Sequence, residues 1–214
     1  MTRTLKVVAV SGSLTQPSKT TTLVNGIVDA LGRAIPIDAR VITLTELGPS
    51  LAGIINRADL PPAALEELRH IETADVLIVA TPVYRASFTG LFKHLFDFVD
   101  QYALVDVPVL LAASGGSERH SLIIEHQLRP LFGFFQAVTL PVGVYAHDSD
   151  FTGYEITAPL LLSRIDMAIS RGLPLIRSNV AERDRIEQEL TAGLREDGQD
   201  STPVAPEKVV RLYS

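Results

Sequence analysis

Small hydroxyl residues, one glycine and one lysine gather between residues 11 and 21, where a short β-branched run gives way to a helical pattern. A strand that ends at Ser11 would leave the loop 12–18 beside the N-terminus of the next helix. Unpaired N–H groups and the positive end of the helix dipole converge at such a place and attract a phosphate. The same residue types also cap helices that bind nothing. The predicted phosphate donors are Ser11, Ser13, Ser18, Lys19, Thr20 and Thr21.

The spacing of this segment departs from two common phosphate loops. A P-loop needs a glycine, four residues and then Gly-Lys-Ser/Thr. Here five residues separate Gly12 from Ser18, and Ser18 stands where the second glycine belongs. The dinucleotide fingerprint needs three glycines, of which only Gly12 is present. A single terminal phosphate wrapped by hydroxyls fits better, which favours a mononucleotide such as FMN.

Two further loops follow predicted strands and share the small or backbone-exposing character of the first. They span residues 81–85 and 114–117. Loops at the carboxyl ends of parallel strands meet at one edge of an open sheet. Tyr84 offers a flat wall, and two glycines in 114–117 let backbone N–H groups approach a flat ring. Taken alone, Tyr84 could equally be a core or interface residue, and 114–117 a simple turn. Together the three loops predict a slot for a flavin.

The elements that must position these loops alternate between strand and helix patterns, which is typical of an α/β parallel sheet. Five strands with helices on both faces predict a doubly wound, flavodoxin-like fold in three α/β/α layers, with the ligand at the switch point of strand order. Residues 45–60 are irregular. The predicted strands are 7–11, 40–44, 75–80, 107–113 and 137–145, and the predicted helices are 20–31, 61–71, 87–99, 121–132 and 158–170.

Composition excludes several classes of protein. The 214 residues, 46% of them hydrophobic, suffice for one full core. A net charge of −6 argues against nucleic-acid binding. No apolar run reaches the roughly 18 residues that span a bilayer, and the N-terminus has no signal-peptide core. We therefore expect a cytoplasmic protein without a membrane partner. Cysteine is absent, which excludes disulfides and thiolate catalysis.

These motifs resemble the NAD(P)H-dependent FMN reductases of flavodoxin-like fold, over residues 5–176. The resemblance is greatest to the flavin reductases of two-component alkanesulfonate and methanesulfonate monooxygenase systems, through segment 125–130. In the alkanesulfonate reductase an extra tyrosine makes a π-bulge at a subunit interface, and His126 takes that place here. The motifs are Val10-Ser11-Gly12-Ser13, Ser18-Lys19-Thr20-Thr21, Ala80-Thr81-Pro82-Val83-Tyr84, Ser114-Gly115-Gly116-Ser117 and Glu125-His126-Gln127-Leu128-Arg129-Pro130.

The resemblance implies FMN and NAD(P)H as cofactor and reductant, a homodimer or homotetramer, and a flavin-dependent monooxygenase that receives the reduced flavin. Sparse sulfur, with two methionines, agrees with use under sulfur limitation. Lys19 replaces the family's phosphate-binding arginine, keeping the charge but losing the bidentate fork. Hydride transfer needs no acid or base, so no catalytic residue is expected. The resemblance implies that Ser11, Ser13, Ser18, Lys19, Thr20 and Thr21 hold the phosphate, that Pro82, Val83, Tyr84 and Arg85 border the ring, and that Ser114, Gly115, Gly116 and Ser117 lie opposite.

Several alternatives stay open. The protein could hold FMN tightly and reduce quinones or azo dyes, or it could be a flavodoxin-like electron carrier or binding protein. Arg85 could contact the phosphates of the nicotinamide dinucleotide or be a solvated charge. The histidines lack a partner at metal-ligand spacing, so no metal is expected. We divide the chain into a flavodoxin-like FMN reductase domain, residues 1–178, and a C-terminal helix with a flexible tail, residues 179–214.

Overall fold

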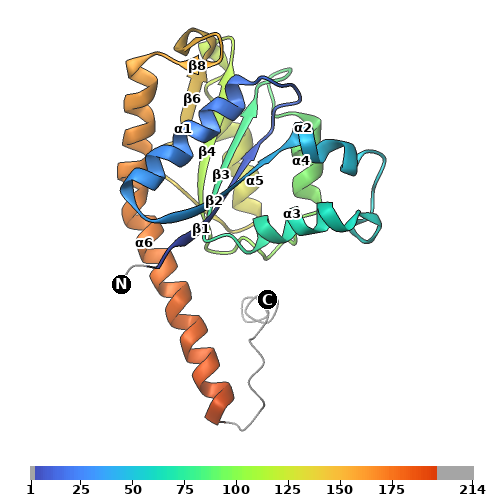
Figure 1. Ribbon diagram of the computed structural model, residues 1–214, viewed down its shortest axis with the longest axis vertical. Helices are drawn as coiled ribbons and strands as arrows, with labels where there is room; N and C mark the ends of the chain where they lie inside the picture. Colours follow the sequence, from blue (N-terminus) through green and yellow to red (C-terminus); the bar gives the residue numbers. More distant parts are fainter. Residues whose placement is uncertain (1–2, 197–214) are drawn as a thin grey trace.

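A parallel sheet forms the centre of the computed structural model, which describes residues 3–196 (Figure 1). The strand order is β2-β1-β3-β4-β5, with β6 also paired to β4, and every pairing in this sheet is parallel. The predicted doubly wound α/β fold is therefore confirmed. The strands are β1 Leu5–Ser11, β2 Ile37–Thr43, β3 Val76–Pro82, β4 Pro108–Gly115, β5 Val138–Thr139 and β6 Val144–His147.

Helices cover both faces of the sheet and complete three layers (Figure 1). Helices α1 and α6 pack on one face, and α3, α4 and α5 pack on the other. The region 45–60, expected to be irregular, contains only short helical turns. The helices are α1 Lys19–Ala34, α2 Leu44–Leu47, α3 Pro62–Glu72, α4 Gly90–Asp97, α5 Arg129–Phe134 and α6 Pro159–Glu196.

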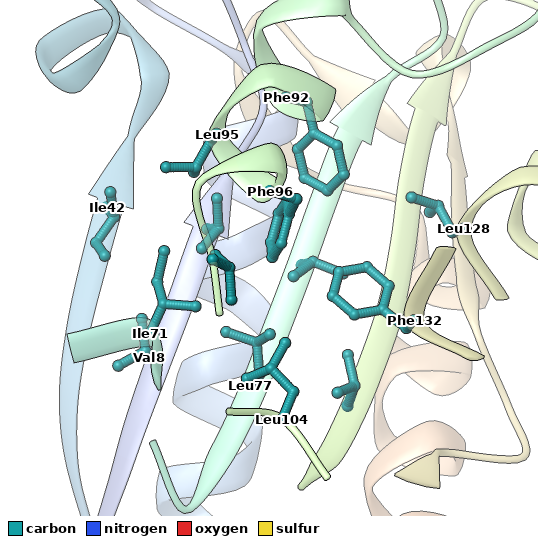
Figure 2. Close-up of a cluster of buried hydrophobic side chains, with 14 of the residues drawn as sticks. Val8, Ile42, Ile71, Leu77, Phe92, Leu95, Phe96, Leu104, Leu128 and Phe132 are labelled. Atoms are coloured by element: carbon teal, nitrogen blue, oxygen red, sulfur yellow. The ribbon is translucent and has the colours of Figure 1, made fainter. Parts of the chain in front are cut away.

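The core lies on both faces because the central strands are apolar on both sides, as a sheet sandwiched between helices requires. The face toward α3, α4 and α5 contains a group of phenylalanines among aliphatic side chains (Figure 2). There Phe96 meets Phe92 at 4.9 Å and Phe132 at 5.0 Å between ring centroids. The face toward α1 and α6 is filled mainly by aliphatic side chains such as Leu23 and Ile27. Burying each large side chain contributes about 1.5–3 kcal/mol, and this rigid core fixes the strand ends.

The last predicted strand, 137–145, is wrong in extent, because the chain forms two short strands there. Both β5 and β6 pair with the same edge of β4, so the sheet keeps five strand positions along its width. Pro141 lies between the two strands and has no N–H to donate. Gly143 presses against Ile124, where a Cβ would come within 2.6 Å. The interruption follows from these two residues. A short antiparallel hairpin, β7 Phe151–Thr152 with β8 Glu155–Ile156, comes next.

The predicted helix 121–132 is not one regular helix. A 3₁₀ turn, η3 Glu118–His120, precedes a π-helix, η4 Ile124–Leu128, which runs into α5. The Arg129 N–H donates to the Ile124 carbonyl, five residues back, which is the π-helical spacing. His126 lies inside this π-helix and is exposed. A π-helix is therefore present around His126, in the segment where the resemblance implied a bulge.

The last helix is much longer than the predicted 158–170. Helix α6 continues without interruption to Glu196, through the proposed division at residue 178, and its second half extends past the amino edge of the sheet (Figure 1). The division into two units stays a prediction. Most of the predicted flexible tail falls within 197–214, outside the described residues.

No helix in the described range 3–196 combines the length and the apolar character that a bilayer span needs.

Candidate functional site

The three predicted loops meet at the carboxyl edge of the sheet, at the top of Figure 1. The strands that carry them are neighbours, with Ser11 beside Ala80 and Pro82 beside Ser114 in the register. Hydrogen bonds then join the loops directly. Thr89 Oγ1, just before α4, donates to the Gly12 carbonyl at 3.1 Å. The sheet therefore brings together the residues that sequence analysis selected.

The N-terminus of α1 presents backbone donors to the first loop. Ser18 is the N-cap, and its hydroxyl accepts from the Thr21 N–H at 3.3 Å. Over residues 3–196, the N–H groups of Ser18, Lys19 and Thr20 make no hydrogen bond within the chain. The first turn of α1 also contains no acidic residue. Unpaired donors at the positive end of a helix form an anion site, so this geometry suits a phosphate.

Close approach to this loop depends on Gly12. Its N–H donates to the Ala80 carbonyl at 2.7 Å. A Cβ at this position would lie 2.8 Å from the Phe92 ring and 3.1 Å from the Ala80 oxygen. The glycine thus lets the loop turn tightly over the aromatic core and places it against β3.

Three of the predicted phosphate hydroxyls, those of Ser11, Thr20 and Thr21, tie elements together. The Ser11 and Thr21 hydroxyls are 2.8 Å apart, and those of Thr20 and Ser114 are 2.7 Å apart. Ser11, Thr20 and Ser114 are buried. The Ser13 hydroxyl, also buried, donates to the Thr15 carbonyl at 3.0 Å. These bonds fix the loops relative to one another. The backbone N–H groups at the N-terminus of α1 stay unpaired within the described part of the chain. Phosphate contacts by these hydroxyls stay a prediction.

Lys19 has a partner that the sequence did not reveal. Its Nζ lies 2.9 Å from Asp148 Oδ1 and 3.3 Å from the Asp148 carbonyl. It also lies over the Phe151 ring, 5.7 Å from the centroid. Asp148 and Phe151 belong to the segment 148–151 that follows β6. The only cation of the predicted phosphate loop is therefore paired with a carboxylate from a fourth loop.

The second loop forms a tight turn at Tyr84–Ser87. Tyr84 N–H donates to the Ser87 carbonyl at 2.8 Å, and Ser87 N–H returns a bond at 3.1 Å. Both central residues have positive φ, 51° at Arg85 and 67° at Ala86, as in a type I′ turn. A positive φ costs a residue with a side chain about 1 kcal/mol relative to glycine. The turn holds Tyr84 and Arg85 exposed at the edge. Pro82 and Val83 lie half-buried at its base.

The third loop is supported from the neighbouring strand β6. Val83 N–H donates to the Ser114 carbonyl at 2.9 Å, which joins it to the second loop. Tyr145 Oη donates to the Ser117 carbonyl at 2.6 Å. A Cβ at Gly115 would lie 2.6 Å from the same Tyr145 oxygen. Burial raises the pKa of Tyr145, and nearby carboxylates add to the effect. The phenol thus stays protonated and keeps donating.

His147 fastens the same loop. Its Nε2 donates to the Gly116 carbonyl at 3.1 Å, while Nδ1 accepts from the Ser149 N–H at 3.1 Å. Because a carbonyl accepts and a backbone N–H donates, these contacts give Nε2 the donor role and Nδ1 the acceptor role. The buried Asp150 accepts from the His147 N–H at 2.9 Å. The segment after β6 is therefore rigidly folded beneath the third loop.

Sequence reasoning missed Tyr145, His147 and Asp148. The rule that carboxyl ends of parallel strands meet at one edge applies to the last strand as well, and would have marked this loop. Gly115 pairs with His147 in the register of β4 and β6. The segment belongs to the same edge as the three predicted loops.

The predicted solvated or packed roles of the histidines agree with their contacts where these are recorded. His94 Nε2 lies 3.2 Å from the Leu51 carbonyl, and His70 lies 3.6 Å from Glu66. The residues that the structure describes contain no group of three or more His, Cys, Asp or Glu side chains able to hold a metal ion.

Comparison with known proteins points to one family. The family model described as NADPH-dependent FMN reductase matches residues 5–152. The chain is 52% identical over 175 residues to an FMN reductase (NADPH) of Pseudomonas aeruginosa, covering 82% of this chain and 94% of that one. It is 51% identical over 180 residues to the NADH-dependent FMN reductase SfnF of Pseudomonas fluorescens, covering 84% and 96%. Among solved structures, an oxidoreductase from Corynebacterium diphtheriae superposes with a TM-score of 0.73 at 35% identity, covering 82% and 99%.

Proposed function

The chain belongs to the NADPH-dependent FMN reductase family, and from that membership we propose that FMN binds across its carboxyl-edge loops and leaves, once reduced, for a separate monooxygenase. The protein is an NAD(P)H:FMN oxidoreductase. FMN supplies the ring that accepts hydride from the nicotinamide. The chain's own residues have to bind, orient and shield the two partners.

One observation carries the proposed binding site. The unpaired N–H groups of Ser18, Lys19 and Thr20 lie at the start of α1, next to a loop that contains no carboxylate. A phosphate monoester offers three strong acceptor oxygens and up to two negative charges. The three N–H donors equal the three phosphate oxygens in number, and the positive end of the helix complements their negative charge. The hydroxyls of Ser13, Ser18 and Thr21 lie in the same loop and first helical turn.

The ring is assigned to the space between the second and third loops. Pro82, Val83, Tyr84 and Arg85 would border one side. Gly115 and Gly116 would lie on the other side, where the lack of a Cβ lets Tyr145 and Asp148 pack closely against the loop. The rigid turn at 84–87 and the bonds from β6 keep both walls in place, which lowers the entropic cost of orienting the reactants. Arg85, exposed and without a hydrogen bond or ion pair in residues 3–196, is available to the phosphates of NAD(P)H.

The small number of cationic groups at the site supports the proposed release of reduced flavin to a partner enzyme. The predicted phosphate loop has one cation, and that cation is engaged by Asp148. A low content of sulfur residues, with no cysteine and two methionines, supports a role in sulfonate or other organosulfur assimilation. The proposed recipient is a flavin-dependent monooxygenase.

We also propose that the protein is a homodimer or homotetramer. Large apolar side chains flank the π-helix and face solvent in the single chain: Leu122 is 59% exposed and Phe134 is 65% exposed. Large apolar side chains that face solvent are typical of protein–protein interaction surfaces. Light scattering coupled to size-exclusion chromatography would give the mass of the assembly.

A steady-state assay tests the proposed function. Oxidation of NADH or NADPH by purified apoprotein is followed while free FMN is added. Saturation with FMN as a substrate, at enzyme concentrations far below the flavin, is the expected result. Turnover only after a quinone or azo dye is added would instead identify an enzyme with tightly held FMN. Absence of oxidation under every condition would identify a carrier or binding protein.

A further inference from the structure

The ion pair between Lys19 and Asp148 links two parts of the fold that are far apart in the chain. Lys19 is the first residue of α1, and Asp148 begins the 3₁₀ turn η5 Asp148–Asp150 after β6. The Lys19 side chain is 31% exposed and that of Asp148 is 57% exposed. Their contact distance is 2.9 Å. The ion pair therefore lies in water at the rim of the site. Its two side chains can separate without leaving either charge buried and unpaired.

Lys19 holds the one positive charge in the segment 11–22. A phosphate at the α1 N-terminus would meet the backbone N–H of Lys19 itself, which places the same residue's ammonium group nearby. The ammonium is bound to the carboxylate and the backbone carbonyl of Asp148. A phosphate must therefore compete with Asp148 for this cation, and it adds its own negative charge beside that carboxylate.

We infer that Asp148 is a built-in competitor of the flavin phosphate, which weakens the hold on FMN and thereby speeds release of the product. This inference rests on the proposed function and adds a specificity-determining residue to it. The phosphate dianion outcompetes a single carboxylate because it carries more charge and more acceptor atoms. Asp148 is already largely solvated, so its displacement leaves no buried unpaired charge. The net affinity for the phosphate is lower than the amides and Lys19 alone would give.

Asp148 also lies close to the third loop, the one assigned to the flavin ring. One of its carboxylate oxygens, Oδ2, lies 3.1 Å from the place that a Cβ on Gly116 would occupy. The carboxylate therefore stands between the phosphate loop and the loop assigned to the ring. Neighbouring bonds from His147 and Asp150 fix the backbone of this turn. The backbone that carries Asp148 is therefore fixed at the rim, which keeps the carboxylate within reach of Lys19.

The test compares FMN with riboflavin, which lacks the phosphate. Dissociation constants for both are measured by quenching of flavin fluorescence for the unaltered protein and for Asp148→Asn, Lys19→Met and the double variant. Asp148→Asn should tighten FMN binding about fivefold and leave riboflavin binding unchanged, since a solvated pair is worth about 1 kcal/mol at most. The gain should vanish in the Lys19→Met background. The dissociation rate of FMN should fall in step with the gain in affinity.

Three results would overturn the inference. Weaker FMN binding in Asp148→Asn would mean that the carboxylate positions Lys19 for the phosphate. Unchanged binding would remove any competition. A gain that persists without Lys19 would be a general effect of charge, which Glu118→Gln, a neutral variant of a carboxylate beside the same loop, would reproduce. Thermal unfolding of each variant confirms that it is folded. If the unaltered protein binds neither flavin, the proposed function itself fails, and this outcome is separate from the three above.

Discussion

The two ends of the same strands are built in opposite ways. At the amino edge, the buried Asp75 accepts from Arg3 Nη1 at 2.6 Å, from Arg3 Nη2 at 2.9 Å and from the Lys6 N–H at 2.8 Å. Arg3 also bonds to Asp184 on α6 at 2.8 Å. At the carboxyl edge, the α1 N-terminus leaves amides unpaired and a turn holds two side chains at positive φ. The buried carboxylate at the amino edge has its hydrogen-bond partners, whereas the amides at the start of α1 have none within residues 3–196.

Stability and ligand binding therefore reside at opposite edges of the sheet. Satisfied polar groups at one edge anchor the long helix α6 to the sheet. At the other edge, unpaired N–H donors are free to bind a ligand, and the strained backbone of the turn at 85–86 is typical of a binding site. We therefore expect substitutions at the amino edge to change unfolding with little effect on FMN, and substitutions at the carboxyl edge to change FMN binding more than unfolding.

The largest expected effect is at the amino edge. Asp75→Ala removes one of the two carboxylates that Arg3 binds and leaves the Lys6 amide without its acceptor. We expect a loss of about 2–3 kcal/mol in the free energy of unfolding, somewhat below the value for a fully buried pair because Arg3 is 42% exposed. Urea unfolding measures the loss. Asp184→Ala, which removes a more exposed partner of Arg3, should lose about 1 kcal/mol or less. If Asp75→Ala lost as much free energy of FMN binding as of unfolding, the two edges would not differ as proposed.

At the carboxyl edge, Gly115→Ala places a methyl group against Tyr145 Oη. The loop must shift, so FMN binding should weaken about tenfold, with a stability loss of about 1–2 kcal/mol from overpacking. Fluorescence titration and urea unfolding give the two numbers. Gly133→Ala in α5, where a Cβ would meet nothing within 4 Å, is the matched control and should not weaken FMN binding. Removal of the phenol oxygen by Tyr145→Phe should restore part of the loss in Gly115→Ala; no recovery would contradict the steric cause.

The two edges should also respond to different ranges of pH. Burial would raise the pKa of Asp75, but the Arg3 hydrogen bonds and the Lys6 N–H outweigh it and lower that pKa. A carboxyl with a lowered folded pKa stabilises the fold above its unfolded pKa of about 4 and loses that contribution as pH falls through the folded value. FMN affinity should fall earlier, below about pH 6, as the flavin phosphate gains a proton. Urea unfolding and flavin titration across pH separate the two. Parallel curves would argue against the contrast.

The smallest expected effect concerns the strained turn. Ala86→Gly removes a side chain held at a φ of 67° and should stabilise the protein by about 0.5 kcal/mol, after allowance for the greater freedom of glycine in the unfolded chain. Ala181→Gly in the middle of α6 should instead destabilise by about 1 kcal/mol. Differential scanning calorimetry compares them. Destabilisation by both glycines would show that the turn is not strained.

Much of the sheet could be predicted from the sequence because apolar runs of parallel strands are a local signal. Strands β3 and β4 lie within two residues of their predicted bounds. The start of β2 was missed, since this edge strand is exposed over residues 38–41 and reads as polar. The π-helix was not readable from periodicity, because its defining bond joins Ile124 to Arg129 through the backbone.

The candidate site divides in the same way. Hydroxyls, glycines and the helix start at Ser18 are local features, and sequence analysis found them. The partner of Lys19 lies 129 residues away in the chain, and no local pattern indicates such a contact. Likewise, the Thr20–Ser114 bond that fixes two loops exists only once β1, β3 and β4 are side by side.

Hydrogen exchange of the backbone amides, followed by mass spectrometry with and without FMN, would show which edge of the sheet binds the flavin. We expect FMN to slow exchange in peptides that contain Ser18–Thr20, residues 82–87 and residues 114–117, while peptides at Arg3–Lys6 and around Asp184 exchange as before. Slowing confined to the amino edge or to α6, with no change at the start of α1, would contradict this expectation.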